Sequence, residues 1–301
     1  RRTVLTAAGV MSTSSPSPRT AGQRHENPSP VGASGIAVGS GVGAAGLTVI
    51  ALLAAYQEIV AKKIGEALDF SIMDPLVFFG LLVGVAIPAV FSAMLILGVD
   101  KNAQRMISEI HRQFTEIPGL AEGRPGVEPE YNKCIDIATT GALKELIPAG
   151  LMAIIATLAV GLIGGVNAIG GFLLGNIISG LLLALFMSNA GGLWDNAKKY
   201  IESGNEGGKG SDAHKAGVIG DTVGDPFKDT AGPALNPLIK VMNTVGLLIA
   251  PAIVTYADSL ALKLIGVVLA AIIAVALILG KRETKDVQEA EQALEHAGGK
   301  G

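Results

Sequence analysis

Six long apolar runs divide the chain into candidate helices, and glycine-rich or charged connections separate them. The runs cover 35–56, 75–99, 137–163, 168–189, 241–254 and 262–280. A helix needs about 20 apolar residues to cross the hydrocarbon core of a bilayer, and most of these runs reach that length. Because lipid offers no hydrogen bonds to the backbone, such runs are expected to be helical. The pattern therefore predicts an all-α, polytopic transmembrane helix bundle of about six spans.

Three regions follow from this pattern. Residues 41–280 hold the apolar runs and are predicted to form the membrane bundle, and 281–301 form a charged tail. Residues 1–40 are divergent: they begin with a stretch rich in serine, proline and arginine, with no acidic residue before Glu26. This composition fits a disordered N-terminal stretch or a transit-like segment. A frameshifted coding region that regains its frame near Gly41 is a third interpretation.

The composition excludes several classes of protein. Half of the residues are hydrophobic, the mean hydropathy is +0.50 and only 16% are charged, which argues against two soluble domains. The 40 glycines suit closely packed membrane helices. A net charge of -3 is too small to indicate nucleic acid as a partner, and none is expected. Cys134 is alone, so no disulfide can form within the chain.

Basic residues are unevenly distributed between the alternate connections. Most of them lie in 100–136, in 198–228 and in the C-terminal tail, whereas the opposite side carries only Lys62, Lys63 and Lys263. By the positive-inside rule, the first group of connections faces the cytoplasm.

Six polar side chains recur at helical spacing between 221 and 240. They are Asp221, Asp225, Lys228, Asp229, Asn236 and Lys240. On one helix they would fall within an arc of about 120° and form a polar stripe that enters the fifth apolar run. Charged groups at that depth are costly and are by default functional. Pro226, Pro233 and Pro237 remove backbone donors and are expected to bend this helix.

A second charged cluster precedes the stripe on the same predicted face. Asp195, Lys198 and Lys199 are spaced i, i+3 and i+4, so Asp195 and both lysines share one helix face. Carboxylates hold Mg²⁺ and lysines hold phosphate oxygens, and a carboxylate can act as general base. The alternative is interfacial charge, with lysines reaching toward the headgroups and aspartates near helix starts. Two such clusters on one face favour a site for a metal-bound polyanion.

The motifs SNAGGLWDNAKKYIE (188–202) and GDTVGDPFKDTAGPALNPLIK (220–240) resemble the C-terminal motifs of the membrane-bound, ion-translocating (H⁺/Na⁺) pyrophosphatases. The likeness extends over 41–256. It implies a homodimeric, all-helical, multi-pass integral membrane protein that hydrolyses pyrophosphate with Mg²⁺ and pumps H⁺ or Na⁺. It also implies a catalytic face toward the cytoplasm, a position in the cell membrane in a prokaryote, and K⁺ as a further candidate cofactor.

The resemblance also implies roles for particular residues. The catalytic and Mg²⁺-binding residues would be Asp195, Asp221, Asp225 and Asp229. The substrate-binding residues would be Lys198, Lys199 and Lys228, and the ion gate and coupling residues would be Asn236 and Lys240.

The chain also departs from this family. The family's earlier motifs, including its gate carboxylates, are absent, and PSPVGASGIAVGSG stands where a GNTT-type stretch is expected. The sequence therefore predicts a C-terminal fragment of such a pump that is inactive alone. The rival prediction is a non-enzymatic membrane transporter or scaffold with an intramembrane Asp/Lys stripe.

Overall fold

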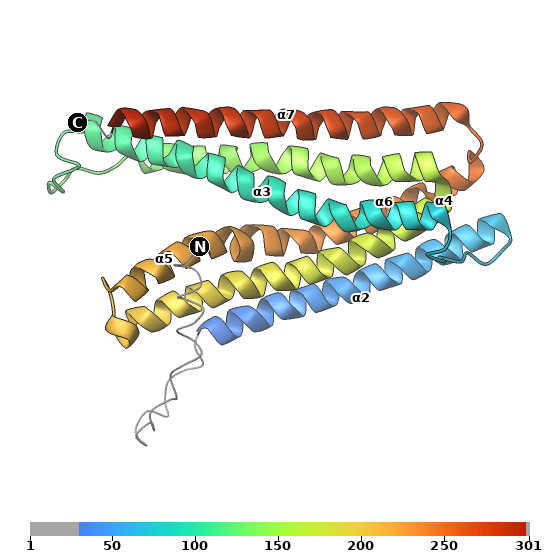
Figure 1. Ribbon diagram of the computed structural model, residues 1–301, viewed down its shortest axis with the longest axis horizontal. Coiled ribbons are helices and arrows are strands. Elements are labelled where there is room, and N and C mark those ends of the chain that lie inside the picture. Colours follow the sequence, from blue (N-terminus) through green and yellow to red (C-terminus); the bar gives the residue numbers. More distant parts are fainter. Residues whose placement is uncertain (1–29, 299–301) are drawn as a thin grey trace, which may run out of the picture. The chain divides into compact units, whose positions relative to one another are not determined.

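The computed structural model describes the backbone of residues 30–298 and the side chains of residues 41–279, and all regular elements in this part are helical. In order they are α2 (Pro30–Ile64), α3 (Pro75–Glu116), α4 (Tyr131–Glu202), η1 (Asn205–Gly207), α5 (Asp212–Asp225), η2 (Pro226–Ala231), α6 (Gly232–Thr255) and α7 (Leu260–Gly298), as Figure 1 shows. The all-α prediction is confirmed. The predictions for 1–40 and for the end of the tail lie largely outside the described residues.

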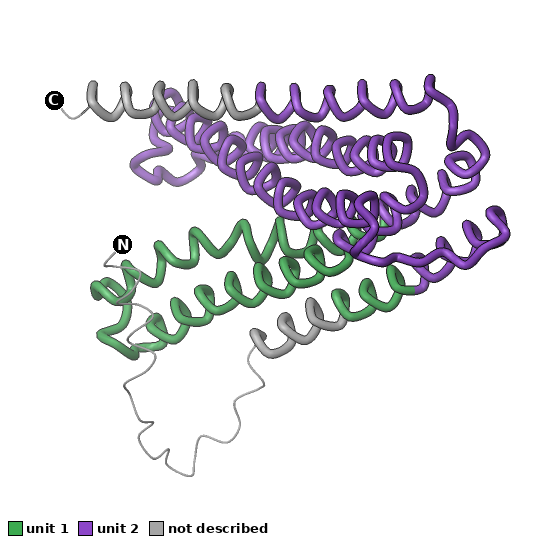
Figure 2. The backbone as a smooth tube through the Cα atoms, turned by 45° about the vertical axis from the view of Figure 1, so that its right-hand side comes forward, with its two compact units in different colours: residues 1–50, 177–240 green, residues 51–176, 241–301 purple. Residues whose placement is uncertain are grey.

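Two compact units make up the chain (Figure 2). Unit 1 consists of 1–50 and 177–240, and unit 2 consists of 51–176 and 241–301. Residues of both charged motifs, from Asp195 to Lys240, belong to unit 1.

Five helical segments are long and apolar enough to cross a membrane. They are Gly41–Ile64, Pro75–Glu116, Tyr131–Glu202, Asp212–Thr255 and Leu260–Leu279. The sequence predicted about six spans, because it divided the region of α4 in two. In the structure α4 is assigned as one 72-residue helix, but the backbone at Gly165 is not helical (φ 70°, ψ -162°). That conformation is essentially restricted to glycine, so Gly165 joins two successive helices that match the two predicted runs.

Close packing of α3 against α4 in unit 2 depends on glycine. A Cβ atom added to any of four glycines would collide with a backbone atom of the facing helix. The pairs are Gly80 with Ala168, Gly84 with Phe172, Gly171 with Val77, and Gly175 with Leu81. Both helices thus carry the small-xxx-small pattern that lets membrane helices approach closely. The glycines here allow two helices to pack closely, as the glycine content of the sequence predicted.

The prolines of the predicted stripe change the helix locally without ending it. Pro226 follows α5 directly and begins the π-helix η2, and α6 begins at Gly232. The helical path from 212 to 255 is therefore continuous. A π turn is wider than an α turn, so a rotation of 100° per residue does not hold across 226–231. The prediction that the six polar side chains share one arc therefore holds within α5 and within α6, but not across η2.

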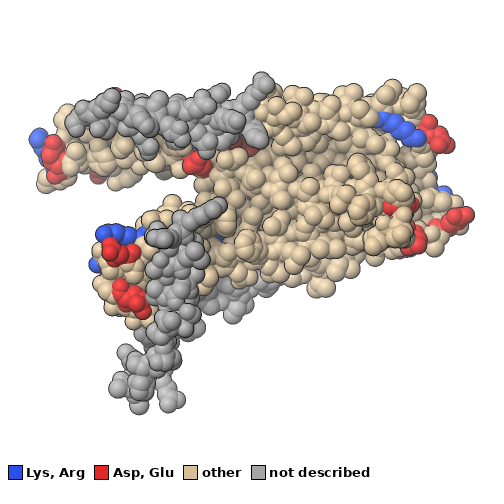
Figure 3. All heavy atoms as spheres, viewed as in Figure 1, with Lys and Arg blue, Asp and Glu red and all other residues tan. Residues whose placement is uncertain are grey.

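The surface shows where the polar groups of the helices lie. In Figure 3 the lysine, arginine, aspartate and glutamate side chains gather toward helix ends, and the visible surface between them is largely uncharged. On α7, the large apolar side chains of Leu264, Val268 and Ile272 are at least half exposed. Exposed apolar helices of this length suit a lipid environment.

Candidate active site

The centre of the charged region in unit 1 is the ammonium of Lys228, which lies among four carboxylates. Its Nζ atom is 2.6 Å from Asp225, 3.3 Å from Asp195, 3.3 Å from Asp221 and 3.9 Å from Asp229. These residues come from α4, α5 and η2. One cation therefore connects the two motifs that the sequence placed on separate helices.

Two further lysines complete this cluster, here named the Lys228 cluster (Asp195, Lys198, Lys199, Asp221, Asp225, Lys228 and Asp229). Lys198 donates to Asp221 Oδ2 at 2.6 Å, and Lys199 donates to Asp195 Oδ2 at 2.9 Å. The cluster thus combines four carboxylates with three ammonium groups. The structure brings together all seven predicted catalytic, metal-binding and substrate-binding residues.

Local sequence explains how α4 comes close enough to α5 and η2. A Cβ atom on Gly191 would collide with the Gly224 carbonyl oxygen and would crowd the backbone and Cβ of Lys228. Gly220 similarly leaves room for the ring of Trp194. These glycines let the helix that carries Asp195 approach the turn that carries Lys228.

Burial differs strongly among the four aspartates. The side chain of Asp221 is 8% exposed and that of Asp195 is 22% exposed, whereas Asp225 is 50% exposed and Asp229 is 67% exposed. Asp221 is held by hydrogen bonds from Lys198 and Lys228. The cluster therefore has a buried, fully paired side and an accessible side formed by Asp225 and Asp229.

Asn236 and Lys240 lie further along α6 and make no ion pair with the Lys228 cluster. Both are half-buried, and the Oδ1 atom of Asn236 is buried without a hydrogen-bond partner. Within residues 41–279 the Lys240 ammonium has no hydrogen bond or ion pair. Lys240 follows Asp229 by 11 residues, which is about 16 Å along a helix. The structure thus separates the proposed gate residues from the proposed catalytic residues.

Ser188 is a polar residue near the cluster that the sequence reasoning did not select. Its Oγ atom is buried and unpartnered, and a Cβ atom on Gly232 would lie 2.6 Å from it. An unpaired buried polar group costs about 1–3 kcal/mol. Ser188 precedes Asp195 by seven residues, or two helical turns, and this spacing was the signal that could have identified it.

The donor set can be tested for its fit to Mg²⁺. No group of three His, Cys, Asp or Glu residues between 41 and 279 converges as a ready metal site, because the carboxylates surround Lys228 instead. Mg²⁺ in phosphate-handling sites is usually held by one or two carboxylates together with substrate oxygens and waters. The exposed carboxylates of Asp225 and Asp229 are donors of this kind. The residues therefore fit Mg²⁺ in chemistry, with substrate supplying further ligands.

Comparisons with known proteins give a consistent result. The family model described as inorganic H⁺ pyrophosphatase matches residues 6–249. The chain is 46% identical over 275 residues to the K(+)-insensitive pyrophosphate-energized proton pump of Chloroflexus aurantiacus, covering 86% of this chain and 34% of the relative. It is 48% identical over 216 residues to the pump of the same name from Methanosarcina mazei, covering 72% of this chain and 31% of the relative.

A relative with a different transported ion is equally similar. The chain is 46% identical over 228 residues to the putative K(+)-stimulated pyrophosphate-energized sodium pump of Clostridium tetani, covering 75% of this chain and 33% of the relative. The chain thus spans about a third of the length of these relatives. The five candidate spans and the matches to pumps indicate an integral membrane protein. The sequence motifs, the helical fold and the match over 6–249 show that this chain belongs to the inorganic H⁺ pyrophosphatase family.

Proposed function

We propose that the chain is the C-terminal part of a membrane pump that hydrolyses pyrophosphate with Mg²⁺ and transports H⁺ or Na⁺. The observation that carries this proposal is the Lys228 cluster, in which three ammonium groups and four carboxylates from the two family motifs converge. The three relatives described above are named as pyrophosphate-energized pumps. A non-enzymatic transporter or scaffold is not favoured, because these relatives are named for energising transport with pyrophosphate.

Substrate binding uses the two kinds of charge in the cluster. The lysines Lys198, Lys199 and Lys228 bind phosphate oxygens, because an ammonium is a compact charge that can reorient toward an anion. The aspartates Asp195, Asp221, Asp225 and Asp229 hold Mg²⁺, which, when bound, neutralises phosphate charge and polarises the phosphorus–oxygen bonds. Each ammonium pairs with at least one carboxylate, so the cluster holds its charges in position for a substrate.

Hydrolysis proceeds by direct attack of water on one phosphorus atom of the phosphoanhydride. The new oxygen–phosphorus bond forms while the bridging oxygen–phosphorus bond breaks, and the water proton passes to a carboxylate. Asp229 is the best-placed base, because it is exposed and is the only aspartate of the cluster without a hydrogen bond from a lysine among the described residues. A carboxylate has two oxygens, so Asp229 can bind Mg²⁺ through one oxygen and accept the water proton on the other.

Transport is assigned to the deeper part of α6. Asn236 and Lys240 form the coupling and gate positions. The Lys240 ammonium has no partner among residues 41–279, and it pairs with a carboxylate outside this range. The proposal includes a homodimer in a lipid bilayer, with the Lys228 cluster facing the cytoplasm because basic connections favour that side. K⁺ stays a candidate cofactor, since relatives named K(+)-insensitive and K(+)-stimulated are equally similar.

A chimeric pump tests this proposal directly. Residues 41–256 would replace the corresponding segment of the Chloroflexus aurantiacus pump, and Mg²⁺-dependent phosphate release and ion uptake would be measured in the same vesicles. We expect both activities in the chimera and neither in the isolated chain. A chimera that inserts and folds but hydrolyses no pyrophosphate would contradict the proposal.

A further inference from the structure

A cavity of about 190 Å³ opens in unit 2 where several helix ends meet. Its walls are the turn 161–165 within α4, the end of α6 with the loop that follows, and the first turns of α3 and α7. A water molecule occupies about 30 Å³ in the liquid, so the cavity admits a group considerably larger than one water. It is separate from the Lys228 cluster, which belongs to unit 1.

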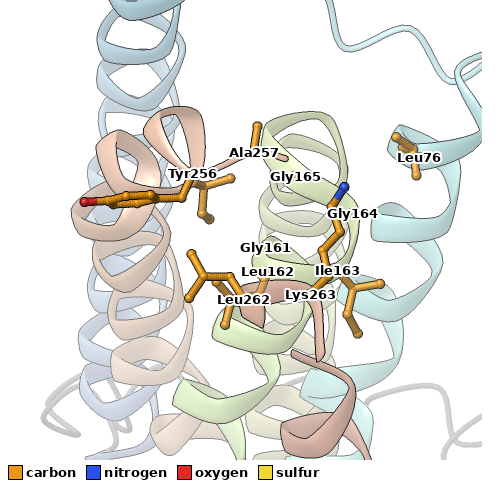
Figure 4. Close-up of a pocket in the computed structure, with 11 residues that line it drawn as sticks. Leu76, Gly161, Leu162, Ile163, Gly164, Gly165, Tyr256, Ala257, Leu262 and Lys263 are labelled. Carbon is orange, nitrogen blue, oxygen red and sulfur yellow. The ribbon is translucent and has the colours of Figure 1, made fainter. Parts of the chain in front are cut away.

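The lining of this cavity is apolar with a single charge. Leu76, Ile163 and Leu262 contribute aliphatic side chains, and Lys263 is the only charged residue among the eleven that line it. Figure 4 shows the Lys263 ammonium directed toward Gly164 and Gly165 in the 161–165 turn, here called the glycine turn. The Tyr256 hydroxyl points away from the cavity. The cavity therefore presents one cation beside an apolar surface.

The charge of Lys263 is not compensated by any side chain among residues 41–279. Among residues 41–279 its ammonium makes no hydrogen bond or ion pair, in contrast to Lys62, which pairs with Glu58 at 2.7 Å. An unpaired ammonium at an apolar cavity favours a ligand that is both anionic and apolar. No carboxylate lines the cavity, so a metal cation is not favoured there.

The surroundings indicate which anion fits. The cavity lies where α3 and α7 begin and α6 ends, and the ends of spanning helices lie at the level of the lipid headgroups. Beside it, α7 exposes Leu260 (70%) and Leu264 (57%). We propose that the cavity binds an anionic phospholipid, with its phosphate on Lys263 and its acyl chains along α7. An ammonium at the level of the headgroups attracts a phosphate by its charge. By the distribution of basic residues, this headgroup would belong to the leaflet opposite the cytoplasm.

This site lies partly outside the matched family region and does not depend on the proposed pump activity. The family model matches residues 6–249, whereas Tyr256, Ala257, Leu262 and Lys263 follow that range. Headgroup binding would attach α7 to the glycine turn of α4. Gly266 already packs against α4, since a Cβ atom there would meet Leu162 and Ile163.

The test uses the full chain purified in detergent and titrated with phosphatidylglycerol in excess phosphatidylcholine, with retained lipids counted by native mass spectrometry. We expect a preference for phosphatidylglycerol that falls about fivefold in Lys263→Gln, the effect of one basic residue near an anionic headgroup. Lys63→Gln is the matched control, because Lys63 is also exposed and unpaired within residues 41–279. It should retain the preference within about twofold.

A second variant separates shape from charge. Leu262→Trp enlarges a side chain that lines the cavity and keeps Lys263, so it should reduce phosphatidylglycerol retention as Lys263→Gln does, with helicity by circular dichroism unchanged. Equal losses in Lys63→Gln and Lys263→Gln would overturn the proposal, because the preference would then reflect general basic charge. Complete displacement of the lipid by inorganic phosphate would also overturn it, because the cavity would then hold a free anion.

Discussion

Two clusters in this protein are built around a central cation that contacts several carboxylates, and they differ in how that cation is held. In unit 2, Arg112 donates to Glu109, Glu116 and Glu130 at 2.6–2.9 Å. Gln113 also donates to Glu109 and accepts from the backbone N–H of Glu130. In unit 1, Lys228 contacts its four aspartates at distances from 2.6 to 3.9 Å.

The difference separates a structural network from a candidate site. The planar guanidinium of Arg112 is engaged on several sides, so it ties the end of α3 to the segment before α4 and leaves Glu109 buried and satisfied. The Lys228 ammonium is a point charge that can exchange partners, and two of its aspartates are half exposed or more. Access alone does not identify a site, because Glu116 and Glu130 of the Arg112 network are also half exposed or more. The difference lies in the pairing, which is fixed by the guanidinium fork in one cluster and exchangeable at an ammonium in the other.

The largest effect is expected from Lys228→Ala in the chimeric pump. Loss of the central ammonium removes a phosphate contact and leaves the buried carboxylate of Asp221 with one lysine instead of two. Removing one preorganised electrostatic contact typically lowers kcat about 10²- to 10³-fold. Phosphate release measures this, and Lys209→Ala, at an exposed lysine without an ion pair among residues 41–279, should keep the wild-type rate. Wild-type turnover by Lys228→Ala would remove the cluster from the mechanism.

Adjacent glycines allow a test of how the cluster is assembled. Gly191→Ala forces a methyl group against Gly224 and Lys228, so we expect destabilisation of about 1–3 kcal/mol and a fall in hydrolysis as Asp195 moves away. Gly192→Ala places its methyl group in open space and should be neutral or stabilising by up to about 1 kcal/mol. Thermal unfolding and phosphate release measure both. Identical behaviour of the two variants would refute the close approach of α4 to η2.

Lys240→Ala should separate transport from chemistry. Because Lys240 lies about 16 Å along the helix from Asp229, it is too far to hold the same phosphate. We expect a lower ratio of ions moved to pyrophosphate hydrolysed, with little change in KM. Ion uptake and phosphate release in the same vesicles give this ratio, and a wild-type ratio and rate would leave Lys240 as a structural lysine.

The smallest effect on activity is expected in the Arg112 network. Arg112→Lys keeps the charge but loses the fork that reaches three glutamates, so the melting temperature should fall while hydrolysis stays within about twofold of wild type. Differential scanning fluorimetry and phosphate release measure the two properties. A large loss of hydrolysis without a change in melting temperature would show that this network also serves catalysis.

The sequence by itself determined the helical class, the apolar runs and the residues of both charged motifs. These properties are local, because span length follows from apolar composition and the spacing of Asp195, Lys198 and Lys199 follows from the helical period. Sequence reasoning therefore selected all seven residues that meet in the Lys228 cluster. The roles of those residues, and the domain boundaries at 40 and 280, stay predictions.

The tertiary structure alone decided which local patterns meet. The contact of Asp195 with Lys228 joins residues far apart in the chain and depends on glycine contacts that helical spacing does not encode. Tertiary contacts also revealed the Arg112 network and the buried hydroxyl of Ser188, and the backbone showed the π turn at 226–231. Electrostatic and packing energies depend on the distances between side chains on different helices. A local sequence pattern does not specify those distances.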